Sequence, residues 1–97
     1  MNYINELQKA IDYIEDNLEN NINFEIVAKE VGMSAFYFHR IFSSVIGISP
    51  TAYIRNRRLT VAAQEISKNS ENIFDIALKY GFESHEPFSR AFKNAPS

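Results

Sequence analysis

Apolar residues recur every three or four positions through the first part of the chain. Isoleucine and leucine occupy positions spaced by 3, 4, 3 and 4 residues, namely Ile4, Leu7, Ile11, Ile14 and Leu18. This spacing places one apolar stripe along an α-helix with a largely acidic outer face, and it predicts a helix over residues 3–19. Asn20 and Asn21 are expected to end this helix, since asparagine tolerates the left-handed conformation. The stripe spans only about two heptads, fewer than a coiled coil needs, so we expect it to pack on its own domain.

Two shorter helices are predicted next, joined by a turn at a glycine. Asn23 suits the N-cap of a helix over about residues 24–31, and Ser34 suits the N-cap of the next helix, which runs to about Val45. Gly32, between them, can take the positive φ angle that a tight turn requires. Two helices joined by a short turn containing glycine form the helix-turn-helix arrangement.

The second helix of this pair has an apolar inner face and an unusual outer face. Helical spacing places four apolar residues on the inner face: Phe38, Ile41, Phe42 and Val45. It places Phe36, Arg40 and Ser43 on the outer face, with Tyr37 and His39 on the flanks. An aromatic ring and an arginine one turn apart on an outward face suit a helix in a DNA major groove, where arginine reads guanine and apolar groups contact thymine methyls.

A long connecting helix follows. Gly47 suits the end of the preceding helix, and Ser49 with Pro50 is a typical start signal, with serine as N-cap and proline at the first helical position. The predicted helix covers about residues 50–67 and would span roughly 27 Å. A polar break follows it, and Asn72 is placed to cap the next helix.

Residues 73–92 repeat the pattern of residues 24–42. At an offset of 49, the earlier inner-face residues Phe24, Val27, Ala28, Val31 and Gly32 are matched by Ile73, Ile76, Ala77, Tyr80 and Gly81. After a turn one residue longer, Phe38, Arg40 and Phe42 are matched by Phe88, Arg90 and Phe92. The repeat predicts a second helix-turn-helix unit.

The predicted fold is all-α, with two helix-turn-helix subdomains joined by a long linker helix. We expect one domain over residues 1–97, with a first lobe of about 1–48, a linker helix of about 50–67 and a second lobe of about 72–94. Dimeric helix-turn-helix proteins place their recognition helices about 34 Å apart, one turn of DNA. A linker of similar length lets one chain present both helices to successive major grooves.

Charge is unevenly distributed along the chain, although the net charge is only −2. Residues 1–31 carry seven acidic and two basic side chains, whereas residues 32–68 carry one acidic and five basic side chains. The folded domain is therefore expected to have a basic and an acidic face, with modest non-specific affinity for nucleic acid.

Several classes of protein are excluded by composition. The chain has no cysteine, which excludes disulfides and thiolate metal sites, and with only two histidines a structural zinc site is not expected. No cofactor is expected. The start of the chain does not have the pattern of a signal peptide, and no apolar stretch approaches the length of a membrane span, so we expect a cytoplasmic protein that does not contact membranes. No nucleophile–base pair or glycine-rich phosphate loop is present, so an enzyme is not expected.

Three segments together resemble the DNA-binding domain of AraC/XylS-type transcription regulators: AKEVGMSAFYFHRIF, GISPTAYIRNRRLTVA and IFDIALKYGFESHEPFSRAFK. The resemblance covers most of residues 24–93 and implies a tandem helix-turn-helix fold that binds specific sites on double-stranded DNA. It also implies RNA polymerase as a partner, and a C-terminal effector or dimerisation domain beyond Ser97 in a longer protein.

In the family pattern, the outward positions of both recognition helices meet bases and phosphates. Carried over by position, these are Ser34, Ala35, Phe36, Tyr37, His39 and Arg40 in the first unit, and Ser84, His85, Glu86, Ser89, Arg90 and Lys93 in the second. Lys68 is a further candidate for a phosphate contact, as are the amides at the starts of both helices.

Several of these residues have a second interpretation. Arg40 and Arg90 can contact phosphate without reading a base, and Glu86 can pair with Arg90 instead of accepting from cytosine. Phe36 can fold back onto the first helix or the linker helix, and Tyr37 can simply pack. Of the linker arginines at positions 55, 57 and 58, some are expected to pair with acidic residues inside the domain.

A second function remains open from the residues alone. A helical module that binds another protein can use Phe36 and Tyr37 as anchors, and the acidic net charge keeps this alternative in view.

Overall fold

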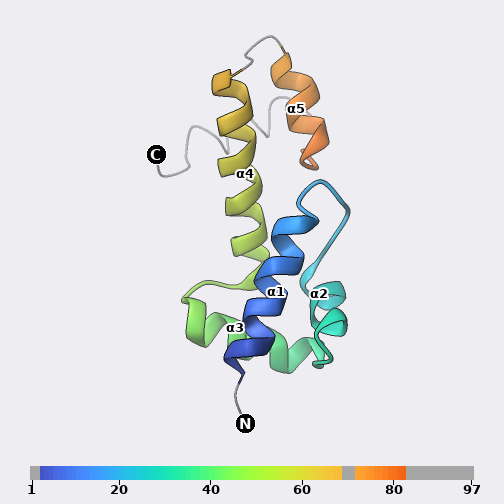
Figure 1. Cartoon of the computed structure of the whole chain (residues 1–97), viewed down its shortest axis with the longest axis vertical. Coiled ribbons are helices and arrows are strands. Elements are labelled where there is room, and N and C mark those ends of the chain that lie inside the picture. Colours follow the sequence, from blue (N-terminus) through green and yellow to red (C-terminus); the bar gives the residue numbers. More distant parts are fainter. Residues whose placement is uncertain (1–2, 69–71, 83–97) are drawn as a thin grey trace.

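The computed structural model of the chain describes residues 3–68 and 72–82. This part contains five α-helices and is elongated, with α1, α2 and α3 gathered at one end and α4 leading from them to α5 (Figure 1). The helices are α1 (Ile4–Asp16), α2 (Phe24–Glu30), α3 (Ala35–Ile46), α4 (Pro50–Lys68) and α5 (Ile73–Lys79). The all-α prediction is confirmed for the described residues.

Helix α1 ends earlier than its apolar stripe predicts. Its C-cap is Asn17, whose side chain donates to the carbonyl oxygen of Tyr13 at 2.8 Å. No described residue other than glycine has a positive φ, so the prediction that Asn20 and Asn21 end the helix in the left-handed conformation is wrong. Leu18 is nevertheless buried, because the chain turns after α1 in a way that keeps this side chain in the core.

The caps predicted for α2, α3 and α4 are confirmed. Asn23 Oδ1 accepts from the Ile26 amide at 2.9 Å, Ser34 Oγ from the Tyr37 amide at 3.2 Å, and Ser49 Oγ from the Ala52 amide at 3.1 Å. Asn72 stands at the N-cap position of α5 but makes no side-chain cap hydrogen bond, so its predicted capping role is wrong.

Two phenylalanines of α3 fill the centre of the first lobe. Phe38 and Phe42 are fully buried, and the Phe42 ring lies 5.5 Å from the rings of both Phe38 and Tyr53. Val45 is 59% exposed, so its predicted place on the inner face is wrong. Val45 lies in the last turn of α3, beyond the point where Phe42 meets Tyr53 of α4.

The turn after α2 and the turn after α5 have the same hydrogen bonds. Met33 N donates to Ala28 O at 2.9 Å, and Phe82 N donates to Ala77 O at 3.0 Å. The glycine of each turn has a positive φ, 74° at Gly32 and 89° at Gly81. These pairs are 49 residues apart, so the internal repeat seen in the sequence is a repeat of backbone structure up to Phe82.

Candidate nucleic-acid interface

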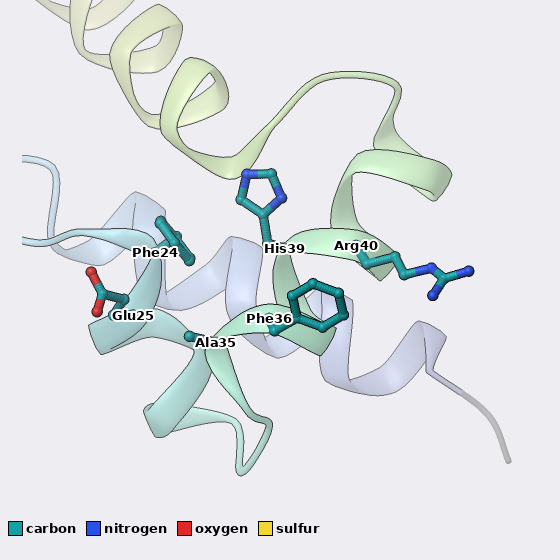
Figure 2. A pocket seen from close by; sticks show the side chains of 6 residues that line it. All are labelled: Phe24, Glu25, Ala35, Phe36, His39 and Arg40. Carbon is teal, nitrogen blue, oxygen red and sulfur yellow. The ribbon is translucent and has the colours of Figure 1, made fainter.

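The outer face of α3 presents an aromatic ring and an arginine to solvent. Phe36 is 77% exposed, so the alternative in which it folds back onto another helix is wrong. Arg40 is exposed and makes no hydrogen bond or ion pair with any residue that the structure describes. Both side chains project from α3 in Figure 2, with the Arg40 guanidinium extended away from the protein. Both groups are therefore available to a ligand.

A hollow of about 510 Å³ lies beside these two side chains. It is bordered by the start of α2 and the first turns of α3, and its lining residues are Phe24, Glu25, Ala35, Phe36, His39 and Arg40 (Figure 2). Aromatic and aliphatic groups form most of this lining, with the Arg40 guanidinium as donor and the Glu25 carboxylate as acceptor. Such a surface complements the methyl groups, carbonyl acceptors and amino donors of base edges in a major groove.

Phe24 and Glu25 are absent from the site that the sequence predicts. Phe24 packs against the core, as its predicted place on the inner face of α2 requires, but it is only partly buried, and its ring meets the His39 ring edge-on with centroids 5.1 Å apart. Both residues directly follow the N-cap Asn23, and this position at the start of α2 is the sole local signal that could have placed them at the site. Their place beside α3 depends on how α2 and α3 cross.

Tyr37 and Ser43 are occupied by contacts within the protein. The Tyr37 hydroxyl bonds to the Tyr3 hydroxyl at 2.8 Å, and the two rings pack edge-on. This hydrogen bond raises the pKa of Tyr3 above its ordinary value. Ser43 was expected to point outward, but it is partly buried and its hydroxyl donates to the His39 carbonyl oxygen at 2.7 Å. Tyr37 thus ties the start of α3 to the start of α1.

The linker arginines have separate roles. Arg57 makes a two-point ion pair with Glu15, with both N–O distances at 2.9 Å, and this bond raises the pKa of Arg57. The expectation of pairing with an acidic residue is therefore confirmed for Arg57. Arg58 bonds backbone carbonyls instead, and Arg55 is exposed on α4.

The second predicted recognition helix lies outside the described residues. Its candidate residues are Ser84, His85, Glu86, Ser89, Arg90 and Lys93. Lys68 is described, and it is exposed at the last position of α4.

Within the described ranges, 3–68 and 72–82, no group of three or more acidic or histidine side chains is arranged to hold a metal ion. Over the same residues, no helix combines the length and apolar character needed to cross a bilayer.

Comparisons with known proteins agree on one family. A family model described as a helix-turn-helix domain matches residues 27–95. The chain is 44% identical over 93 residues to the HTH-type transcriptional regulator YbfP of Bacillus subtilis, covering 96% of this chain and 32% of that protein. It is 39% identical over 88 residues to the multiple antibiotic resistance protein MarA of Escherichia coli, covering 91% of this chain and 69% of MarA.

Solved structures give the same result. A transcriptional regulator from Chromobacterium violaceum, described as containing an AraC-type DNA-binding domain, superimposes with a TM-score of 0.87 at 31% identity. The match covers 93% of this chain and 80% of that one. The chain spans about a third of YbfP and 63% of the Tn10 TetD protein of Escherichia coli, to which it is 43% identical.

Proposed function

The chain belongs to the AraC/XylS family of helix-turn-helix DNA-binding transcription regulators, and from this premise we propose that it reads two successive major grooves with two recognition helices. The first is α3, and the second is the helix that the sequence predicts after the Gly81 turn, outside the described residues. The domain limits that we propose are those expected from the sequence, with lobes of about 1–48 and 72–94.

The repeated turn is the observation that supports this proposal most directly. The same glycine turn follows α2 and α5, so the backbone that leads to α3 in the first unit recurs up to Phe82 in the second. Between them, α4 has 19 residues and a length of roughly 28 Å. That length is close to the separation of about 34 Å between successive major grooves on one side of DNA.

We assign distinct roles to the described residues of the first unit. Arg40 donates to guanine O6 and N7, and Phe36 covers a thymine methyl group. Ser34 and Ala35 place the free amides at the start of α3 against a phosphate, since α3 is long enough to carry a helix dipole. His39 contacts the same strand from its position against Phe24, and Tyr37 contacts a phosphate if its bond to Tyr3 opens.

In the second unit, Arg90 takes the place of Arg40, and Glu86 takes that of Phe36 as an acceptor for cytosine N4. We assign Ser84, His85 and Ser89 to further DNA contacts and Lys93 to a phosphate contact, by their place in the family pattern. Because Phe36 has no aromatic counterpart in this unit, the two half-sites differ in sequence.

Replacing one thymine by deoxyuridine tests the role of Phe36. The change removes a methyl group, whose burial is worth roughly 0.8 kcal/mol, so we expect about fourfold weaker binding of the parent protein. The Phe36→Ala variant should bind both DNAs equally. Fluorescence anisotropy on a selected site, with each thymine replaced in turn, measures the effect. If no such replacement changes the affinity of the parent protein, Phe36 does not contact a thymine methyl group.

Salt dependence tests DNA binding against the alternative of a protein-interaction module. We expect the logarithm of the association constant to fall linearly with the logarithm of salt concentration, by about 0.9 for each phosphate contacted. Lys68→Ala should lower that slope by about 1 if Lys68 contacts a phosphate. An affinity for the selected DNA site that does not change with salt, together with binding to a protein partner, would favour the protein-interaction module.

For the whole protein, we propose RNA polymerase and a C-terminal effector or dimerisation domain as partners. The support is the resemblance together with the lengths of relatives such as YbfP, of which this chain spans about a third.

A further inference from the structure

The loop after α1, the second half of α4 and the end of α5 meet at one place between the two lobes. Figure 1 shows the lower end of α5 close to the loop that follows α1, with α4 beside both. We call this meeting point the interlobe junction and define it by its polar side chains, Glu19, Arg58, Glu65, Lys79 and Tyr80.

Arg58 joins α4 to the loop after α1. Its guanidinium donates to the carbonyl oxygens of Leu18 at 3.0 Å and Asn20 at 2.7 Å. The same group reaches the second lobe, since a Cβ placed on Gly81 would lie 3.7 Å from Arg58 Nη1. Burial lowers the pKa of Arg58 from its ordinary value, although an arginine stays charged at neutral pH.

Glu65 joins α4 to the end of α5. Its carboxylate accepts from the Tyr80 hydroxyl at 2.6 Å and from Lys79 Nζ at 2.9 and 3.2 Å. The hydrogen bond from Tyr80, and after it the one from Lys79, hold the pKa of Glu65 below its ordinary value. Lys79 also lies 3.9 Å from Glu19 in the first lobe, so this lysine of the second lobe is shared between a carboxylate of the first lobe and one of the linker helix.

Apolar packing restrains the rotation of α5 about α4 less strictly than hydrogen bonds do. Ile76 and Ala77 are buried, but such contacts are non-directional and roughly proportional to area. Hydrogen bonds require defined distances and angles. The hydrogen bonds at Glu65 and the approach of Lys79 to Glu19 therefore fix the rotation of α5 about α4.

We propose that the interlobe junction holds the two lobes at one separation and rotation, with Glu65 as the positioning residue. The protein then accepts two half-sites at one spacing only, and this second statement rests on the proposed two-groove function. We assign Glu65 no contact with DNA. It acts by orienting α5, and through α5 the residues that follow it.

The junction itself is tested without DNA. The chain has no cysteine, so Lys9→Cys on α1 and Asp75→Cys on α5 provide two unique sites for spin labels. We expect a narrow distance distribution by double electron–electron resonance in the labelled parent, and a distribution about twice as broad with Glu65→Ala. Gln64→Ala, an exposed neighbour on the same helix, is the matched control and should leave the distribution narrow.

A second variant separates positioning from unfolding. Tyr80→Phe keeps the buried ring and removes only the hydroxyl that donates to Glu65, so α5 remains packed while the distribution broadens. Distributions of equal width in the parent, Glu65→Ala and Tyr80→Phe would overturn the junction as a positioning device.

Spacing is tested on DNA with one base pair inserted between the half-sites, which rotates one half-site by about 34°. The parent and Gln64→Ala should lose about tenfold in affinity, comparable with one mismatched base pair, and Glu65→Ala should lose about threefold or less. An identical loss in all three proteins would overturn the effect on spacing. If the protein binds DNA with two half-sites no more tightly than DNA with one, both the two-groove function and the preference for one spacing are wrong. The spin-label distances still test whether the interlobe junction positions the lobes.

Discussion

Phe42→Ala is expected to lower the free energy of unfolding by about 3–5 kcal/mol, the usual cost of removing a buried phenylalanine ring. The Phe42 ring is fully buried between Phe38 of the same helix and Tyr53 of α4. Its removal leaves a cavity where α3 meets the linker helix. Small domains have only about 5–15 kcal/mol of stability in total. Denaturant titration followed by circular dichroism should show a lower midpoint, and DNA binding should weaken on all sequences alike.

Phe36→Ala is the matched control for this experiment. It removes the same side chain from the same helix, but at a position that is 77% exposed, so stability should change by no more than about 0.5 kcal/mol. Equal losses of stability in the two variants would mean that the inner and outer faces of α3 are assigned wrongly. A Phe42→Ala protein as stable as the parent would contradict the packing described here.

Arg40→Ala is expected to weaken binding to the preferred DNA site by about 1–3 kcal/mol, or about five- to 150-fold. The reason is that Arg40 is exposed, has no partner among the described residues and borders the hollow beside Phe36. In a major groove, its guanidinium can donate two hydrogen bonds to one guanine. Competition binding with every single-base variant of the site should show that specificity is relaxed at one base pair.

Arg55→Ala is the control for loss of charge. Arg55 is also exposed, but it lies on the linker helix, outside the proposed recognition surface. The Arg55→Ala substitution removes one positive charge, so any loss of affinity should be uniform across DNA sequences and should diminish at high salt. If Arg40→Ala behaves in the same way, Arg40 is a phosphate contact. If Arg40→Ala has no effect, α3 does not lie in the groove as proposed.

Local signals predicted the helices of the first lobe well. Asn23, Ser34 and Ser49 act as caps through hydrogen bonds to amides three residues further on, so these signals need no tertiary information. The same argument failed at Asn72, which makes no cap bond, and at the end of α1. At the end of α1, Asn17 supplies the C-cap and the loop after it is bonded to Arg58.

The outer face of α3 was also predictable, because its residues follow from helical spacing alone. Phe36 and Arg40 project as expected. Val45 and Ser43 departed from the pattern for tertiary or local reasons. Val45 lies beyond the packed core, and Ser43 bonds a carbonyl of its own helix.

The all-α fold, the repeat of the glycine turn and the outward aromatic and arginine of α3 could all be predicted from the order of residues along the chain. Each depends on neighbours within a turn or two, or on comparing the chain with itself. Only the tertiary structure brought Phe24 and Glu25 to the recognition surface, and Arg58 and Glu65 to the interlobe junction. Those contacts depend on how helices cross and on long-range pairs such as Glu65 with Tyr80, which no local spacing encodes.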